Sequence, residues 1–181
     1  MLKVTELELN QGCLQEDSRC QQELFRCYAG KMMAVCLRYA RHRLEAEDIL
    51  QDAFLKVFKH LDKFEFKGSF EGWIRRIVVN TALKHFNKKA FVNEQFGAEL
   101  YPDIPVEPDA YDHLREEELM EMVASLPDGY RVVFNLYALE GYNHKEIAEL
   151  LGIQERTSRS QLVKARKMLQ VKLSATQKIA V

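Results

Sequence analysis

The sequence predicts an all-α protein in which two small helical domains are joined by an acidic, proline-containing linker. The 181 residues include only 8 glycines and 4 prolines, which argues against sandwiches, barrels and long disordered tracts. Apolar residues recur at spacings of three and four on both sides of one interruption. That interruption, residues 93–111, contains three of the four prolines, and proline restricts the preceding residue to extended conformations. We therefore expect a tail at 1–19, helical domains at 20–92 and 112–175, and a second tail at 176–181.

Three amphipathic helices are expected in the first domain. One begins near Leu24, the next runs from about Ala46 to Phe64, and the third follows Ser69, a residue type favoured at the N-cap. The spacing places three sets of residues inward: Leu24, Phe25, Tyr28, Met32, Val35 and Cys36; Leu50, Ala53, Phe54, Val57, Leu61 and Phe64; and Phe70, Trp73, Ile74, Ile77 and Thr81.

Two polar faces remain on the outside of this domain. They are Asp48, Gln51, Asp52, Lys56 and Lys59 on the second helix, and the basic, amide-bearing stripe Arg76, Asn80, Lys84, Asn87 and Lys88 on the third. Trp73 is expected in the core, because of its inward spacing beside Ile74 and Ile77.

Four helices are expected after the linker. The first covers about 112–124, and the second opens at Pro127, because proline suits the first helical position. The second should bury Tyr130, Val133, Phe134 and Tyr137. The last two helices form a helix-turn-helix, the unit that places its second helix in the DNA major groove.

The helix-turn-helix prediction depends on a glycine turn and on the two faces of the helix after it. Gly152 suits the left-handed residue that ends a helix, and Ala148 is small enough to let two helices approach closely. The next helix directs Ser158, Leu162, Ala165 and Leu169 inward, and its opposite face is basic. Such a face is often merely solvated, but the preceding turn favours DNA contact.

The net charge of −1 is the sum of opposed blocks. Residues 20–92 carry fourteen basic and eight acidic side chains, whereas residues 93–121 carry one and ten. Residues 122–181 are again basic, with nine against five. Contact with a polyanion at two places would produce this pattern, and so would a two-domain protein with a solvated linker.

Several classes of protein are not expected from this composition. The four cysteines form no C-x-x-C pair, so they predict reduced thiols rather than a zinc site or a disulfide framework. No run of eighteen apolar residues occurs and the first residues do not resemble a signal peptide, so we expect a cytoplasmic protein without membrane insertion. Residues 116–118 are consecutive glutamates that fan around a helix, and no phosphate-binding loop or nucleophile elbow is present. We therefore expect neither an enzyme nor a bound metal or cofactor.

Five blocks of this sequence, taken in order, resemble the bacterial RNA polymerase sigma factors of the extracytoplasmic-function (ECF) subfamily. The likeness covers about residues 20–175. The blocks are residues 47–58, 68–80, 126–127, 131–136 and 146–153. Each block alone is weak evidence, but their order around an acidic linker is highly specific.

The resemblance implies a transcription initiation factor that binds core RNA polymerase and reads the −10 and −35 promoter elements. It assigns core binding, on the clamp helices of the largest subunit, to Asp48, Gln51, Asp52 and Phe54, and it implies a further contact with the flap. It assigns −10 DNA to Phe64, Lys67, Ser69, Arg76, Asn80 and Lys84. It also implies an alternative for Trp73, as an aromatic wedge that stacks on the opened strand. It assigns −35 DNA to Arg156, Arg159, Ser160, Val163, Lys164, Arg166 and Lys167.

Some residues depart from the family pattern, and one other function is compatible with the sequence. Ser158 stands where an aliphatic residue is usual, and Gln161 and Val163 replace larger or basic side chains, so the promoter sequence is not predicted. Family members are often inhibited by an anti-sigma factor, although no residue here predicts one. The alternative is an autonomous helix-turn-helix regulator with an N-terminal ligand or dimerisation domain.

Overall fold

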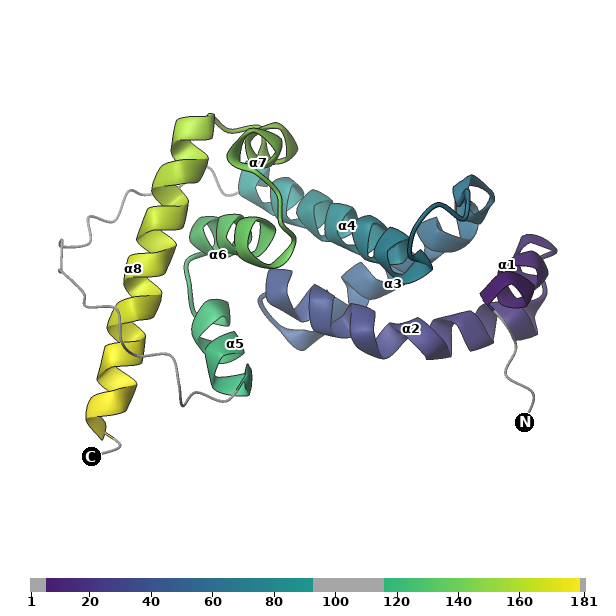
Figure 1. Ribbon diagram of the computed structural model, residues 1–181, viewed down its shortest axis with the longest axis horizontal. Coiled ribbons are helices and arrows are strands. Elements are labelled where there is room, and N and C mark those ends of the chain that lie inside the picture. Colours follow the sequence, from purple (N-terminus) through teal and green to yellow (C-terminus); the bar gives the residue numbers. More distant parts are fainter. Residues whose placement is uncertain (1–5, 93–115, 180–181) are drawn as a thin grey trace. The chain divides into compact units, whose positions relative to one another are not determined.

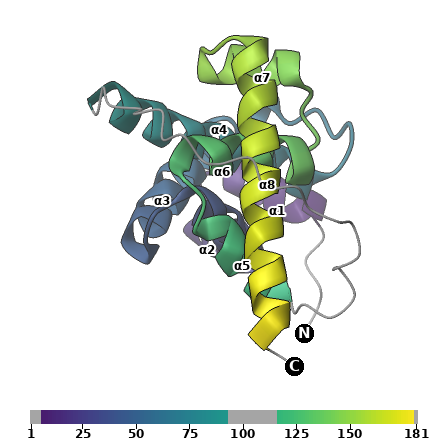
Figure 2. The same cartoon turned by 90° about the vertical axis from the view of Figure 1, so that its left-hand side faces the viewer.

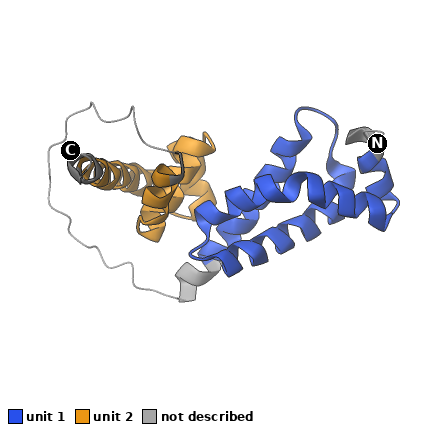
Figure 3. Ribbon diagram, turned by 90° about the horizontal axis from the view of Figure 1, so that it is seen from below, with its two compact units in different colours: residues 1–88 blue, residues 89–181 orange. Residues whose placement is uncertain are grey.

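The computed structural model describes residues 6–92 and 116–179, and within these two ranges every regular element is a helix (Figures 1 and 2). The all-α prediction is therefore confirmed. The chain divides into two compact units, residues 1–88 and 89–181 (Figure 3). The predicted linker at 93–111 lies outside the described residues.

The first unit contains four α-helices and a short 3₁₀ turn in its described part. They are α1 (Glu6–Leu14), α2 (Ser18–Tyr39), α3 (Arg43–Lys59), the 3₁₀ helix η1 (Leu61–Lys63) and α4 (Phe70–Val92). Helix α1 corrects the expectation of a tail over residues 1–19. Its Leu9 and Cys13, one turn apart, are buried because α1 packs against α2 and η1.

Side chains at the beginnings of these helices explain where they start. Asp17 accepts a hydrogen bond from the backbone of Arg19 at 2.8 Å, and His42 accepts one from the backbone of Glu45 at 3.2 Å. Ser69 Oγ accepts a hydrogen bond from the Gly72 backbone at 3.2 Å, which confirms the predicted N-cap of α4.

Every residue predicted to point inward from the helix expected at 46–64 is buried, although that helix ends at Lys59 and buried Ala46 and Ile49 were not predicted. Leu50, Ala53, Phe54, Val57, Leu61 and Phe64 are all buried. The other two inward faces are only partly correct. Phe25 is exposed, while Tyr28, Trp73 and Ile77 are half-buried at the edge of the core. The Phe25 ring contacts Phe54 edge-on at 4.7 Å, so it covers the core from outside.

The described part of the second unit is built around one long helix. The elements are α5 (Glu116–Ala124), α6 (Asp128–Phe134), the π-helical segment η2 (Asn135–Leu139), α7 (His144–Leu151) and α8 (Glu155–Ile179). Helices α5, α6 and α7 all pack against α8, with α7 beside its first turns and α5 near its end (Figures 1 and 2). One apolar cluster joins α5 to α8 through Val123, Leu126, Ala165 and Leu169.

The predicted inward face around α6 is partly wrong. Val133 is buried as expected, but Tyr130 and Phe134 are half-buried and Tyr137 is exposed. Val132 and Leu136 are buried instead. The helix widens into the π segment after Phe134, so the 3.6-residue period used for the prediction fails at Leu136 and Tyr137, but this does not account for Tyr130 or Val132. Pro127 also lies one residue earlier than expected, at the N-cap of α6.

Candidate nucleic-acid and partner interfaces

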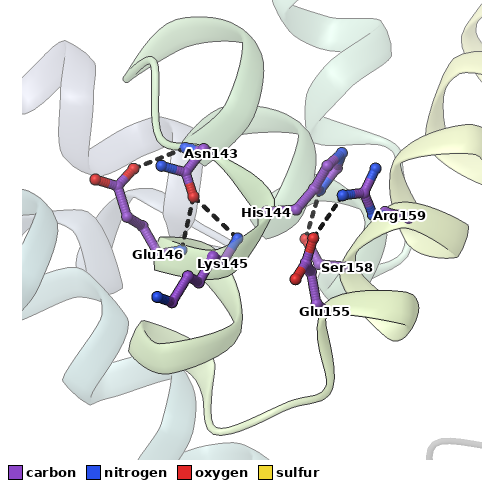
Figure 4. Close-up of polar contacts among 7 residues, drawn as sticks. All are labelled: Asn143, His144, Lys145, Glu146, Glu155, Ser158 and Arg159. Atoms are coloured by element: carbon purple, nitrogen blue, oxygen red, sulfur yellow. Dashed lines mark hydrogen bonds and ion pairs between the residues drawn. The ribbon is translucent and has the colours of Figure 1, made fainter.

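The helix-turn-helix is fixed by a capping box at one end of α7 and a glycine at the other. Asn143 Oδ1 accepts hydrogen bonds from the backbones of Lys145 and Glu146, both at 3.0 Å (Figure 4). Glu146 Oε2 accepts a hydrogen bond from the Asn143 backbone at 2.8 Å, which completes the box. Gly152 has φ of 66°, so the predicted left-handed end of the helix is confirmed.

A buried polar contact joins α7 to α8. Ser158 is fully buried, and its Oγ lies 2.9 Å from Nδ1 of His144 (Figure 4). The His144 ring stacks on Tyr137 at 4.7 Å. This contact explains how a serine is accommodated where the resemblance leads one to expect an aliphatic residue. Burial lowers the pKa of His144, and the nearby charge of Arg159 lowers it further.

The outward residues of α8 form one continuous polar surface, here called the α8 face. Its members are Arg156, Arg159, Ser160, Val163, Lys164 and Arg166, which are exposed, and Lys167, which is half-buried. Arg159 donates to Glu155 Oε1 at 2.5 Å, one turn earlier on the same helix. Lys164 lies over the ring of Tyr130, and Arg166 over that of Tyr137. Neighbouring groups therefore orient three of these cations.

Three residues of the polar stripe predicted on α4 are exposed, whereas Asn87 is half-buried and the side chain of Lys88 lies outside the described residues. Arg76, Asn80 and Lys84 follow one another every four residues, so they lie on one face of the helix, here called the α4 stripe. The residues just before α4 form a short loop, in which Lys67 pairs with Glu65 at 2.7 Å. Trp73 stacks on Phe70 and is half-buried, so it is an edge residue of the core.

Phe64 differs from the other residues that the resemblance assigns to −10 DNA, because its side chain is buried. Its ring contacts those of Phe66, Phe70 and Trp73 at 5.0, 4.8 and 5.6 Å. We correct its assignment from a contact residue to an anchor of the loop. Phe66 lies in the loop at 64–69 that the resemblance assigns to −10 DNA, although it was not named singly; it is 54% exposed and has a left-handed φ of 54°. The nearby Gly68 was the available signal for an irregular backbone.

The outer face of α3 combines acidic and apolar side chains. Asp48, Gln51 and Asp52 are exposed as predicted, but Phe54 is only 2% exposed and cannot take part in an outer contact. Phe54 is buried because its three- and four-residue spacing from other apolar residues places it on the inward face of α3. Two exposed leucines were missed. Leu44, Asp48, Gln51, Asp52 and Leu55 together form the surface that we call the acidic α3 face.

Two side-chain hydrogen bonds connect α3 and α4. His85 Nε2 lies 2.8 Å from Asp52 Oδ2, and Lys56 Nζ donates to Thr81 Oγ1 at 3.0 Å. Neither pair was predicted, because the spacing within one helix does not reveal which residue of another helix lies opposite.

The described cysteines are free thiols, and two of them are buried. In the part of the chain that the structure describes, no three His, Cys, Asp or Glu side chains are grouped closely enough to hold a metal ion. Cys13, Cys20, Cys27 and Cys36 are free, and burial raises the pKa of Cys13 to about 11 and of Cys36 to about 12. No described helix is long and apolar enough to cross a membrane.

Two family descriptions match the sequence, one in each half. Residues 24–92 match Sigma-70 region 2, and residues 116–169 match Sigma-70, region 4. The ECF RNA polymerase sigma-E factor of Haemophilus influenzae is 26% identical over 190 residues, covering 94% of this chain and 96% of that protein.

Other relatives share the same description at different lengths. The ECF RNA polymerase sigma factor SigE of Mycolicibacterium smegmatis is 28% identical over 81% of this chain, but the match spans only 59% of that longer protein. Among solved structures, the sigma factor RpoE of Bartonella quintana, crystallised with the anti-sigma factor NepR, has the same fold. Its TM-score is 0.51 at 19% identity, covering 85% of this chain and 96% of RpoE.

Proposed function

The chain belongs to the ECF sigma factors, which direct RNA polymerase, and from this premise we propose that three surfaces bring the core enzyme to promoters. The acidic α3 face binds core polymerase. The α4 stripe and the loop before it hold the −10 element. The α8 face reads the −35 element, so residues 20–92 and 112–175 act as separate functional domains on either side of the linker at 93–111.

One observation carries this proposal. Two basic helix faces lie on separate units, and all of their side chains except the half-buried Lys167 are exposed. Ser69 caps the beginning of α4, and α8 follows the turn at Gly152. A promoter presents two separate DNA elements, so two independent basic faces match its layout. A single-site regulator would need only the α8 face.

The α8 face has the chemistry to read a duplex in the major groove. An arginine such as Arg159 can donate two hydrogen bonds to guanine, and the exposed methyl groups of Val163 can contact a thymine methyl. Arg156, Arg166 and Lys167 lie in places suited to phosphate contact, which positions the helix without specifying sequence. Glu155 pairs with Arg159 and so orients the guanidinium before DNA arrives.

The α4 stripe and its loop have the chemistry to hold a single strand. Charged and amide side chains bind the backbone, and an exposed aromatic ring stacks on an unpaired base whatever its identity. Phe66 supplies that ring here, and the buried ring of Phe64 packs against it on the side of the protein core. Extrusion of a base from the duplex would provide the unpaired partner.

The acidic α3 face has the mixed character of a protein interface. Exposed carboxylates suit a basic partner surface, and they direct its approach and orientation. Leu44 and Leu55 add apolar area at the two ends of the face, and Leu55 is 67% exposed in the free chain. The clamp helices of the largest polymerase subunit are the proposed partner, with the flap as a second contact for the second unit.

Run-off transcription with purified core polymerase on fragmented genomic DNA tests the proposal. Transcripts that require the chain and start beside two shared, spaced elements are the expected result. An absence of transcripts and of co-elution with core, together with tight operator binding by the free chain, would instead support an autonomous regulator. As a sigma factor the chain is proposed to have no catalytic activity of its own and to act in the cytoplasm, where polymerase is.

Control by an anti-sigma factor is a further part of the proposal. The RpoE structure contains such a partner, NepR, and we extend this kind of control to the present chain. A tagged copy recovered from its host should then carry a protein that suppresses run-off transcription when added back. Recovery with core polymerase alone under all growth conditions would contradict this extension.

A further inference from the structure

The two hydrogen bonds between α3 and α4 join helices that run antiparallel, and each bond is here called a rung. Asp52 meets His85 and Lys56 meets Thr81, so a step of four residues forward on α3 is a step of four residues backward on α4. Four residues advance a helix by about 6 Å, which places the rungs one turn apart.

The two rungs differ in exposure and therefore in what they can do. Thr81 is buried and Lys56 is half-buried. Their hydrogen bond therefore holds the two helices together but presents no exposed carboxylate to a partner. The side chain of Asp52 is 51% exposed and that of His85 is 28% exposed. Asp52 also belongs to the acidic α3 face, so this rung connects that face to α4.

We infer that His85 is a positioning residue, which holds the Asp52 carboxylate in the orientation that a cationic group of core polymerase meets. The inference rests on the proposed role of the acidic α3 face. His85 Nε2 engages Oδ2, and an ionised carboxylate can accept further hydrogen bonds on its other lone pairs. A side chain already fixed in the free protein loses less conformational freedom when its partner binds.

The placement of His85 adds a second consequence. It follows Lys84 of the α4 stripe directly, so one helix turn carries both a predicted −10 contact and the support for a core contact. Asp52 is thereby held by the helix that bears the α4 stripe, rather than by α3 alone.

The chain provides a matched control for a test. His85→Leu removes the donor to Asp52 and keeps side-chain bulk, whereas Lys56→Met removes the other rung, which has no member in the acidic α3 face. His85→Gln restores a donor, because the glutamine amide nitrogen lies at about the same reach as Nε2. The measurement is the Kd of the full chain for purified core polymerase, with thermal melting of each variant recorded by circular dichroism.

We expect His85→Leu to raise the Kd for core polymerase about three- to tenfold. This is the change in Kd that corresponds to the cost of immobilising one additional side chain on binding. His85→Gln should regain the affinity of the unaltered chain, and Lys56→Met should keep it even if its melting temperature falls. Equal weakening by His85→Leu and Lys56→Met would show a general structural role and overturn the inference. Tighter binding by His85→Leu would overturn it too, since the histidine would then be competing with the partner.

A double-mutant cycle separates this inference from the function on which it rests. In an Asp52→Ala background, His85→Leu should have no further effect on Kd. If Asp52→Ala itself leaves Kd unchanged, the proposed acidic α3 face is wrong. If Asp52→Ala weakens binding but His85→Leu does not, only the positioning role is wrong. Should His85→Leu fail to fold, His85→Asn takes its place, because its shorter amide cannot reach Asp52 and stays polar at this half-buried site.

Discussion

Replacing Arg159 by alanine should reduce promoter discrimination far more than it reduces stability. The ion pair with Glu155 is exposed and lies four residues along the same helix, where such pairs contribute about 0.3–0.5 kcal/mol. A bidentate contact between arginine and guanine contributes about 1–3 kcal/mol of discrimination. Arg159→Ala should therefore barely change the melting temperature, while preference for the correct base falls roughly 5- to 150-fold.

Competition between matched promoters, differing by one guanine in the −35 element, measures that preference in run-off assays with core polymerase. Lys167→Ala is the comparison variant, because a phosphate contact should weaken all promoters alike and reduce the salt slope by about one. If Arg159→Ala behaves as Lys167→Ala does, with uniform weakening and a reduced salt slope, then Arg159 contacts phosphate and the proposed guanine contact is wrong.

Three other perturbations test the helix-turn-helix core and the loop before α4. Ser158→Ala leaves His144 Nδ1 without its hydroxyl partner and should lower the free energy of unfolding by about 1–2 kcal/mol in urea denaturation, and a change near zero would contradict the contact. Because burial lowers the pKa of His144 in the fold, the unfolded chain binds the proton first, so stability should decline as pH falls through about 6.5. Thermal melts at pH 7.5 and 5.5 test this, and an unchanged pH dependence in His144→Gln would refute it. Phe66→Ala should weaken binding of a single-stranded −10 oligonucleotide by the holoenzyme by about 1–3 kcal/mol without lowering the melting temperature, whereas Phe64→Ala should destabilise the fold by about 3–5 kcal/mol. Equal effects of the two substitutions on melting would contradict their different burial.

Predictions of inward faces from the sequence were most accurate where a single apolar period runs along a whole helix. All six residues predicted to point inward from the helix expected at 46–64 are buried. The turn at Gly152 and the inward face beginning at Ser158 were found from spacing and glycine chemistry alone. Prediction failed where the period changes. The π segment after Phe134 rotates the following residues, and no local signal in the sequence announces it.

The candidate site was predicted less completely than the fold, for two physical reasons. Phe54 and Phe64 were placed in contact sets by resemblance although their spacing already directed them inward, and their burial follows the spacing. The pairs Asp52–His85 and Ser158–His144 join separate helices, so they depend on tertiary packing that a single-helix pattern does not contain. Helix α1 was missed because nine residues provide too few turns for a clear period.

The left-handed backbone of Phe66 limits which insertions and deletions the loop before α4 can accept during evolution. A side chain other than glycine costs roughly 1–2 kcal/mol in that conformation, and ring contact with Phe64 at 5.0 Å helps to offset the cost. Deleting or inserting one residue between 65 and 68 would alter the backbone turn and rotate the ring away from its support. Surface loops usually tolerate such length changes, but this one is fitted to its own aromatic anchor. We therefore expect its length to be fixed among functional variants, even where its charged residues are freely exchanged.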